Sequence, residues 1–184
     1  RAHPIHDPTM KLLSRLLGAP CVLVLGLSAV ELQSTSASAQ EGKNSIIRIW
    51  DYHNARCLQM LTILVSCVQC LSFSPDGRFL AIVGKEGNQK RYGKEVIFVW
   101  DISRIHKGEE AVLVTKQISE FNILSLKFSP IDSYRLVSCG KQNIRFWRIK
   151  DTRNIRGSAV VLNQHARDTV FTCLDFEMSG TNYS

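Results

Sequence analysis

A chain of 184 residues is long enough for one sizeable hydrophobic core, and 45% hydrophobic with 21% charged residues excludes a disordered protein. The formal net charge of +7 is compatible with an acidic partner, whether nucleic acid, an anionic membrane or an acidic protein surface. Six cysteines without a paired framework favour a reduced chain with buried thiols over a disulfide-stapled one.

The first feature along the chain is an apolar stretch from Leu16 to Val30 that is similar to a secretory signal. Basic residues precede it, and Ala37-Ser38-Ala39 would suit a signal peptidase. The run of about 15 residues is shorter than the ~20 that a membrane-spanning helix needs. Either residues 10–39 are a signal peptide, or the stretch holds the first strands of a fold, with irregular or mispredicted sequence upstream of Val24.

Three alternating runs of β-branched and aromatic residues, each closing on a tryptophan, mark an internal repeat. They are "SIIRIWD", "EVIFVWD" and "QNIRFWR", which end around Trp50, Trp100 and Trp147. The tryptophans are 50 and 47 residues apart. A fourth copy begins at "TCLDFE", residues 172–177.

Two shorter runs joined by turn residues precede each tryptophan run. In the second repeat, Ser74-Pro75-Asp76-Gly77 predicts a tight turn, because proline presets φ and glycine tolerates an unusual φ. In the third repeat, Ser129-Pro130 stands at the corresponding place. Outer strands are expected at Cys57–Val65, Glu110–Ile118 and Ser158–Asn163.

Alignment of the repeats places strands inside the signal-like stretch. If Leu27 is equivalent to Phe73, then Ser38 is equivalent to Val83. "LGLSAV" then forms a first strand, "STSASAQ" a second and "IIRIWD" a third. Cleavage after Ala39 would strip two strands and leave an unpaired edge.

The tryptophan-aspartate endings, the "FSPDG" turn and a period slightly above ~40–45 residues resemble WD repeats, whose fold is a β-propeller of four-stranded blades. The resemblance implies a structural blade signature made of these residues: Trp50, Asp51, Ser74, Pro75, Asp76, Gly77, Trp100, Asp101, Ser129, Pro130 and Trp147.

Departures from the WD pattern imply an incomplete side-chain network. The usual Gly-His is absent before the second and third repeats. His165, ahead of the fourth copy, is the only residue near such a place, and Lys141-Gln142 replaces the usual turn aspartate in the third repeat. Ser38 and Ser138 remain as hydrogen-bond partners for the first and third signature tryptophans. Each missing bond is expected to forfeit roughly 1 kcal/mol.

A narrower resemblance extends from about Leu25 to Glu177. "IIRIWDYHNARCL", "LSFSPDGRFLAIVGK" and "RLVSCGKQNIRFWRIK" are similar to the WD repeat-containing protein 90 family. That resemblance implies a large multi-propeller scaffold of centrioles and ciliary basal bodies, associated with the microtubule wall. It implies no active-site residues.

The candidates for metal or catalytic chemistry are weak. Cys67-Val-Gln-Cys70 is one CxxC on an expected strand, where residues i and i+3 point to opposite faces, and neither His53 nor His106 has ligand spacing to it. No G-x-S-x-G or glycine-rich phosphate loop is present in the sequence. We therefore expect no enzyme, no metal and no cofactor.

The basic segment "KEGNQKRYGK" is the candidate partner loop, inserted between the second and third strands of the second repeat. Its contact residues would be Lys85, Lys90, Arg91, Tyr92 and Lys94. One aromatic among the cations is thin support for nucleic acid, and the same loop suits an acidic protein surface.

The sequence thus predicts an all-β, partial WD-repeat β-propeller with about three blades and the start of a fourth, part of a larger propeller. An irregular segment is expected at 1–23 and blades at about 24–66, 67–118, 119–163 and 164–184. The expected function is a cytoplasmic, non-catalytic scaffold that binds centriolar or ciliary proteins or microtubules, without a small-molecule substrate, nucleic acid or membrane span. Two alternatives stay open: a secreted or periplasmic propeller protein such as a hydrolase, or a subunit of a nucleic-acid-linked assembly.

Overall fold

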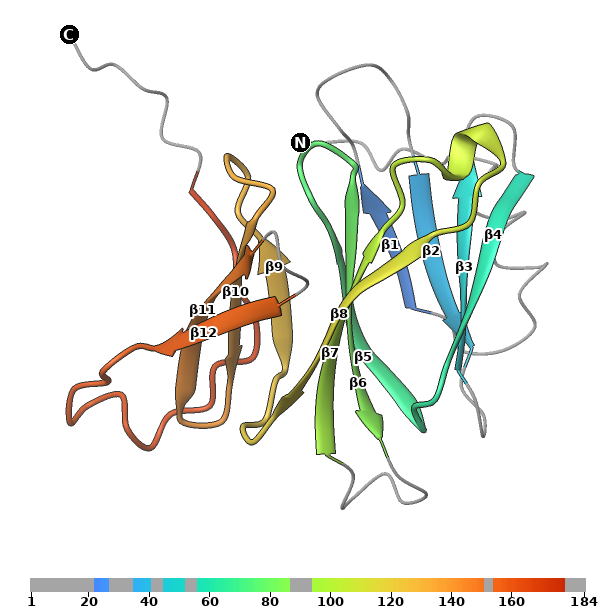
Figure 1. Ribbon diagram of the computed structural model, residues 1–184. Helices are drawn as coiled ribbons and strands as arrows, with labels where there is room; N and C mark the ends of the chain where they lie inside the picture. Colours follow the sequence, from blue (N-terminus) through green and yellow to red (C-terminus); the bar gives the residue numbers. More distant parts are fainter. Residues whose placement is uncertain are drawn as a thin grey trace, which may run out of the picture.

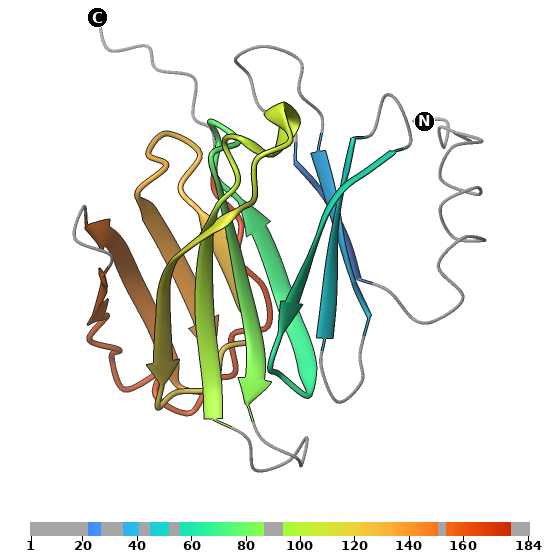
Figure 2. The same ribbon diagram turned by 45° about the vertical axis from the view of Figure 1, so that its right-hand side comes forward.

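The computed structural model describes residues 22–26, 35–40, 45–51, 56–86, 94–150 and 154–177. In these ranges the strands form three antiparallel sheets of four strands each, placed side by side (Figures 1 and 2). Each sheet uses consecutive strands, so each of the three complete repeats of the sequence folds as one blade. This confirms the all-β, partial propeller fold.

The first blade contains β1 (Val22–Gly26), β2 (Thr35–Gln40), β3 (Ser45–Asp51) and β4 (Arg56–Ile63). The second contains β5 (Cys67–Phe73), β6 (Phe79–Glu86), β7 (Lys94–Asp101) and β8 (Val112–Ser119), with a 3-10 turn, η1 (Ile105–Lys107), before β8. The third contains β9 (Ser125–Phe128), β10 (Arg135–Gly140), β11 (Asn143–Lys150) and β12 (Asn154–Ala159).

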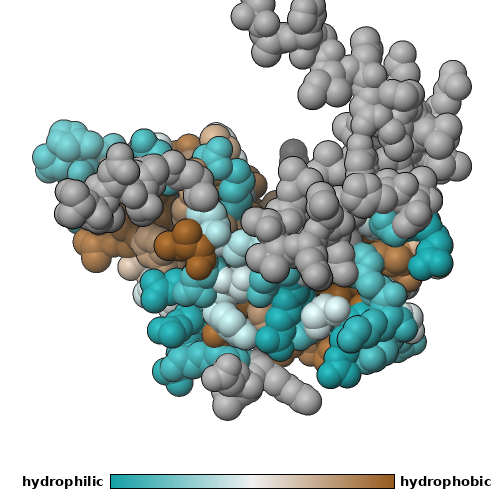
Figure 3. Space-filling model, turned by 90° about the horizontal axis from the view of Figure 1, so that it is seen from above, coloured by the Kyte–Doolittle hydropathy of each residue, from teal (hydrophilic) through white to brown (hydrophobic). Residues whose placement is uncertain are grey.

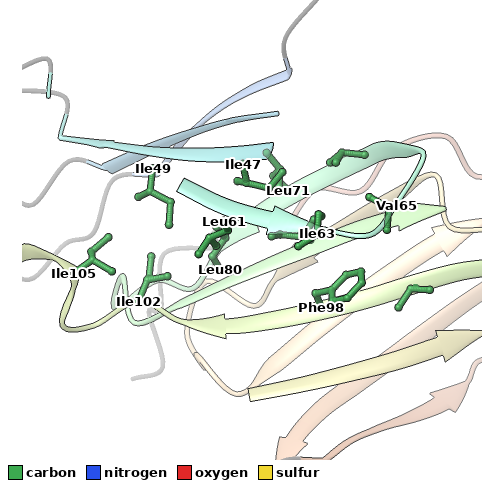
Figure 4. Packing of buried hydrophobic residues seen from close by; sticks show 13 residues of the cluster. Ile47, Ile49, Leu61, Ile63, Val65, Leu71, Leu80, Phe98, Ile102 and Ile105 are labelled. Carbon is green, nitrogen blue, oxygen red and sulfur yellow. The ribbon is translucent and has the colours of Figure 1, made fainter. Parts of the chain in front are cut away.

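The second blade lies between the other two, and its central strands are apolar on both faces. β6 begins with six buried residues, Phe79 to Gly84. Leu80, labelled in Figure 4, and Ile82 pack in a cluster with the first blade, whereas Phe79, Ala81 and Val83 pack in a cluster with the third. A strand covered on both faces must be apolar at successive positions, which explains why "FLAIV" is continuous rather than alternating.

The third blade is covered on one face. In β11, Trp147 and Ile149 are buried in the cluster shared with the second blade, while Phe146 on the opposite face is 54% exposed. Figure 3 shows apolar residues gathered at the left, the side on which Figure 1 places this blade. The alternation in "IRFWRIK" is therefore that of a sheet with one face on the core.

The pairing of the tryptophan strands corrects the expected alignment of the first blade. Trp50 pairs with Ser36, and Trp100 pairs with Leu80. Because Leu25 pairs with Ser36 and Phe73 with Leu80, the equivalent of Phe73 is Leu25, not Leu27. The prediction was wrong by two residues because it allowed only one extra residue between the first two strands of the first blade. The paired residues at this register are 11 apart in the first blade and 7 in the second.

The same register changes two further equivalences. Ser38 pairs with Arg48, two residues before its tryptophan, and the residue in that register in the second blade is Ile82, not Val83. The first strand is Val22–Gly26 instead of "LGLSAV", whose last four residues lie outside the described residues. The second and third strands of the first blade are confirmed.

The outer strand of the third blade lies earlier than expected, at Asn154–Ala159 instead of Ser158–Asn163. Ile155 is 5% exposed in the inter-blade cluster, whereas Val161, in the apolar run that suggested a strand, is 95% exposed. A Cβ on Gly157 would lie 2.6 Å from the Trp147 ring, so only glycine lets β12 approach that ring. The outer strands of the first two blades are confirmed at β4 and β8.

The chain after β12 follows the course of a further innermost strand. Phe171 N–H donates to the Gly140 carbonyl at 3.1 Å, and Lys127 Nζ of β9 lies 2.9 Å from Asp175 Oδ1. β9 itself lies beside β5 in a comparable way, with Phe128 N–H donating to Ser72 Oγ at 3.0 Å. Residues 171–177 form no strand in the described structure, since no second strand of that blade pairs with them there.

The only helical element in the described ranges is η1, so these ranges contain no helix long and apolar enough to cross a membrane.

Candidate docking surface

The signature tryptophans differ in how their indole N–H groups are satisfied. Trp147 Nε1 donates to Ser138 Oγ at 2.8 Å in the buried face of the third blade, as expected. In the second blade Ile82 occupies the place of Ser138, and Trp100 Nε1 is buried without a partner. The expected partial network is therefore confirmed in these two blades, while the Ser38 side chain lies outside the described side chains.

The turn Ser74 to Gly77 forms as predicted. Gly77 N–H donates to the Ser74 carbonyl at 3.0 Å, and Gly77 has a φ of 71°, in the region that favours glycine. Ser74 Oγ donates to Asp76 Oδ1 at 2.5 Å and accepts from Phe79 N–H at 2.8 Å. The Ser74 hydroxyl and the Asp76 carboxylate form hydrogen bonds within the turn, so they stabilise the fold.

Asp101, the aspartate of the second tryptophan-aspartate pair, links the second and third blades through Arg78. Asp101 Oδ2 lies 3.0 Å from Arg78 Nε, and Arg78 Nη1 donates to Tyr134 Oη at 3.0 Å. Burial would raise the pKa of Asp101, but hydrogen bonds from Ser103 and Arg78 outweigh it and hold the pKa below its usual value. The carboxylate is therefore a structural anion rather than a catalytic acid.

Arg148 replaces this aspartate in the third blade, but the main-chain hydrogen bond made by the following residue is present in both blades. Ile149 N–H donates to the Tyr134 carbonyl at 2.8 Å, just as Ile102 N–H donates to the Arg78 carbonyl at 2.8 Å. Arg148 itself is exposed. The side-chain pair is thus dispensable for the strand, while the main-chain bond recurs in both blades.

Glu95 is a buried carboxylate that sequence reasoning missed. It is 6% exposed at the start of β7, and it accepts hydrogen bonds from Asn122 Nδ2 at 2.7 Å and from the Ile123 N–H. Gln69 Nε2 lies 3.4 Å and Lys85 Nζ 3.9 Å from Glu95 Oε1. The sequence feature that could have predicted this role is the single acidic residue at the start of the apolar run "EVIFVW". A lone charge on a buried strand requires hydrogen-bond or ionic partners.

The candidate partner loop is shorter than its residues suggested. Lys85 pairs with Glu95 and Glu86 with Lys94, so both terminal lysines belong to strands β6 and β7. Lys85 is further excluded as a loop contact because its side chain is 22% exposed and faces Glu95. Lys90, Arg91 and Tyr92 lie outside the described residues.

The CxxC pair lies on β5, but the expected opposite orientation is wrong. A bulge between Val68 and Cys70 leaves Cys67 opposite Lys85 and Cys70 opposite Val83. Since those partners are two residues apart, both cysteines lie on one face of the sheet. Burial raises the pKa of Cys70 to about 12, and in the described ranges no three His, Cys, Asp or Glu side chains gather as metal ligands.

Comparison with known families finds the "WD domain, G-beta repeat" model over residues 56–88, which spans β4, β5, β6 and the turn with Ser74. Together with three tryptophan-marked blades in a propeller arrangement, this decides the fold family. The chain is a WD-repeat protein with a partial β-propeller fold.

The WD-repeat chain is similar to two much longer proteins. It is 38% identical over 114 residues to WD repeat-containing protein 90 of Xenopus tropicalis, covering 62% of this chain and 6% of that protein. It is 38% identical over 138 residues to Centriole proteome protein 16 of Chlamydomonas reinhardtii, covering 73% of this chain and 6% of the relative. The chain therefore spans only a small part of the length of these relatives.

A solved structure supports the fold alone. The Cps50 (Swd1) β-propeller domain of Myceliophteria thermophila superposes with a TM-score of 0.55 at 12% identity, covering 77% of this chain and 39% of that domain. This similarity shows the fold and says nothing of partners.

Proposed function

We propose that this WD-repeat chain is a non-catalytic scaffold module that docks protein partners during centriole or cilium assembly, in the cytoskeleton at the centriole or basal body. The observation that carries the proposal is the similarity, at 38% identity over 73% of the chain, to a protein named Centriole proteome protein 16. The link to the microtubule wall rests on the same family resemblance.

The described blades support a docking role over a chemical one. Several of their buried polar side chains serve the fold: Glu95 binds the segment entering β9 from the next blade, and Ser138 binds Trp147 within the third blade. Asp101 is held by Arg78 and Ser103. A rigid stack of blades presents its loops as the variable part of its surface, and loops choose partners.

For the partner contact we propose the connection between β6 and β7, through Lys90, Arg91 and Tyr92, with Lys94 at its edge. Three cations in so short a segment suit an acidic protein surface. Lys85 is omitted from this contact because its ammonium group lies 3.9 Å from the Glu95 carboxylate.

The fold argues against the signal-peptide alternative. Ala37 pairs with Ile49 and Ala39 pairs with Ile47, so the site that would suit a signal peptidase lies within β2. Cleavage after Ala39 would remove β1 and almost all of β2 from the first blade. A protein processed in that way would lose half of one sheet.

Imaging of the full-length endogenous protein, tagged at its C-terminus beside a centriole marker, tests the location. Paired puncta on the centriole wall are the expected result. Signal in the secretory pathway or the medium would contradict the proposal and restore the signal-peptide alternative.

The partner loop is tested by the charge reversal Lys90→Glu with Arg91→Glu. We expect weaker capture of centriolar proteins, measured by affinity purification from ciliated cells at two salt concentrations. Lys107→Glu with Arg167→Glu, two exposed cations elsewhere, is the matched control. Equal capture by both double variants would refute the loop, while nuclease-sensitive binding with a steep salt dependence would favour nucleic acid instead.

A further inference from the structure

An arginine occupies a core position between the second and third blades. Arg145 precedes Trp147 by two residues on β11, and the residue in the same register of the second blade is Phe98, which is 5% exposed in the apolar cluster. Arg145 is half-buried. A guanidinium at a position where another blade has phenylalanine is partly removed from water, which is costly for a cation. Favourable contacts with neighbouring groups must offset that cost.

Aromatic rings hold the Arg145 guanidinium in place. Its central carbon lies 3.8 Å from the centre of the Phe121 ring and 5.9 Å from that of Trp147. Stacking of this kind fixes a guanidinium and leaves the donors at its edge free to bind. The Trp147 ring is itself fixed by the hydrogen bond to Ser138 at 2.8 Å.

The donors of Arg145 lack a protein partner. Its Nε is buried without a hydrogen bond, and no carboxylate in the described ranges forms an ion pair with it, although Glu120 lines the same cavity. The neighbouring donors are consumed, since Gln117 Nε2 donates to the Ile118 carbonyl and Ser119 Oγ to the Phe121 carbonyl, both at 2.9 Å. The N–H groups of the Arg145 guanidinium are thus the hydrogen-bond donors of this cavity that remain available to a ligand.

The cavity beside Arg145 has the size and position for a peptide side chain. Its volume is about 250 Å³, and β8, the segment after it, β11 and β12 form its walls. β8 is the edge strand of the second blade, so its outward N–H and C=O groups can pair with an extended peptide. A single cation complements one carboxylate, whereas a phosphate with a charge of about −1.5 to −2 needs more positive charge.

We propose that Arg145 receives the carboxylate of an acidic side chain from an extended partner peptide that lies along β8. The guanidinium, stacked on Phe121, donates two parallel hydrogen bonds to that carboxylate. This site goes beyond the proposed centriolar scaffold and does not depend on the β6–β7 connection or on the location of the protein.

The test uses the full chain and a fluorescently labelled peptide of alternating glutamate and threonine, with the glutamine-for-glutamate peptide as the ligand control. Arg145→Gln is expected to weaken binding roughly tenfold or more, as for a lost charged hydrogen bond. Arg148→Gln removes the same charge from the exposed face of the same strand and is expected to change affinity less than about twofold. The readout is fluorescence anisotropy, with circular dichroism to verify folding.

Three outcomes would overturn the site: equal losses in the two variants, no binding of the glutamate peptide, or displacement of that peptide by inorganic phosphate at equal concentration. If Arg145→Gln fails to fold, the wild-type chain still gives an answer. Titration with the glutamate peptide should then shift the NMR resonance of the Arg145 Nε–H and the amide of Gly157, and unchanged resonances refute the proposal.

Discussion

At the scale of single residues, the two described indole environments show what one hydroxyl contributes. Trp147 Nε1 reaches Ser138 Oγ, while Trp100 Nε1 is buried without a partner because Ile82 carries no acceptor. Ile82 is fully buried in the cluster with the first blade, so the second blade has exchanged a hydrogen bond for apolar burial. An unsatisfied buried donor costs about 1–3 kcal/mol, which burial of an isoleucine offsets.

Ser138→Ala should lower the free energy of unfolding by about 1–3 kcal/mol, because it leaves the buried Trp147 N–H unpaired. Urea denaturation followed by tryptophan fluorescence measures the change. Ser158→Ala, at an exposed position of β12, is the control and should leave the unfolding free energy nearly unchanged. A loss that is equal in both variants would mean that the Ser138 bond contributes nothing specific.

The Asp101 carboxylate should make stability depend on acid. Its pKa is lowered in the folded chain, so its contribution is complete above the unfolded pKa of about 3.9 and is lost as the pH falls through the folded pKa. Asp101→Asn should therefore destabilise the chain more at pH 7 than at pH 3. Urea denaturation at both pH values measures the difference, with Glu120→Gln as a charge-removal control. An equal loss of unfolding free energy at both pH values would contradict the lowered pKa of Asp101.

At the scale of elements, neighbouring blades are joined by a buried carboxylate as well as by apolar packing. Glu95 on β7 holds the Asn122 side chain and the Ile123 N–H, which enter the innermost strand of the next blade. Ile123 is fully buried, so its amide has no access to water if the carboxylate is lost. The entry of β9 into the fold therefore depends on a residue of the preceding blade.

Glu95→Ala should lower the free energy of unfolding by about 3 kcal/mol or more, because it leaves the buried Asn122 amide and the Ile123 N–H without an acceptor. Glu95→Gln should cost less because its amide oxygen still accepts one hydrogen bond. The measurement is native-state hydrogen exchange at Ile123 and Leu124, which should become faster than at β10. Unchanged exchange at these two amides would show that Glu95 does not hold the β8–β9 connection.

At the scale of the whole molecule, the order of the blades determines which faces can be polar. The second blade is buried on both sides, whereas the outward face of the third carries the exposed Phe146 together with Arg148. Exposed apolar sheet faces and unpaired edges promote association. The middle blade therefore stabilises both neighbours, and each neighbour protects one of its faces.

Removal of residues 1–39, the product of cleavage at the signal-like site, should convert the chain into an aggregating species. The deletion takes away β1 and most of β2 and leaves β3, with its fully buried Ile47 and Ile49, as an edge strand. Size-exclusion chromatography with light scattering measures the result. Removal of residues 1–9 is the control, and a monodisperse 40–184 chain would show that the first blade does not need these strands.

Local sequence alone determined much of the fold. Proline and glycine in the Ser74–Gly77 turn, the continuous apolar run from Phe79 to Val83, and the three tryptophan strands predicted the repeat and its strands, because turn geometry and burial pattern are encoded within a few neighbouring residues. Of the candidate partner loop, Lys85 is held by Glu95 and Lys94 belongs to β7, while Lys90, Arg91 and Tyr92 lie outside the described residues, so the loop stays a prediction.

Only the tertiary structure decided the features that depend on residues distant in the chain. The equivalence of Leu25 with Phe73 depends on turn lengths, which the pairing of strands sets. The shift of β12 depends on the space that Gly157 leaves for the Trp147 ring. The role of Glu95 and the free guanidinium of Arg145 depend on contacts between blades, and no local pattern encodes a partner that another blade supplies.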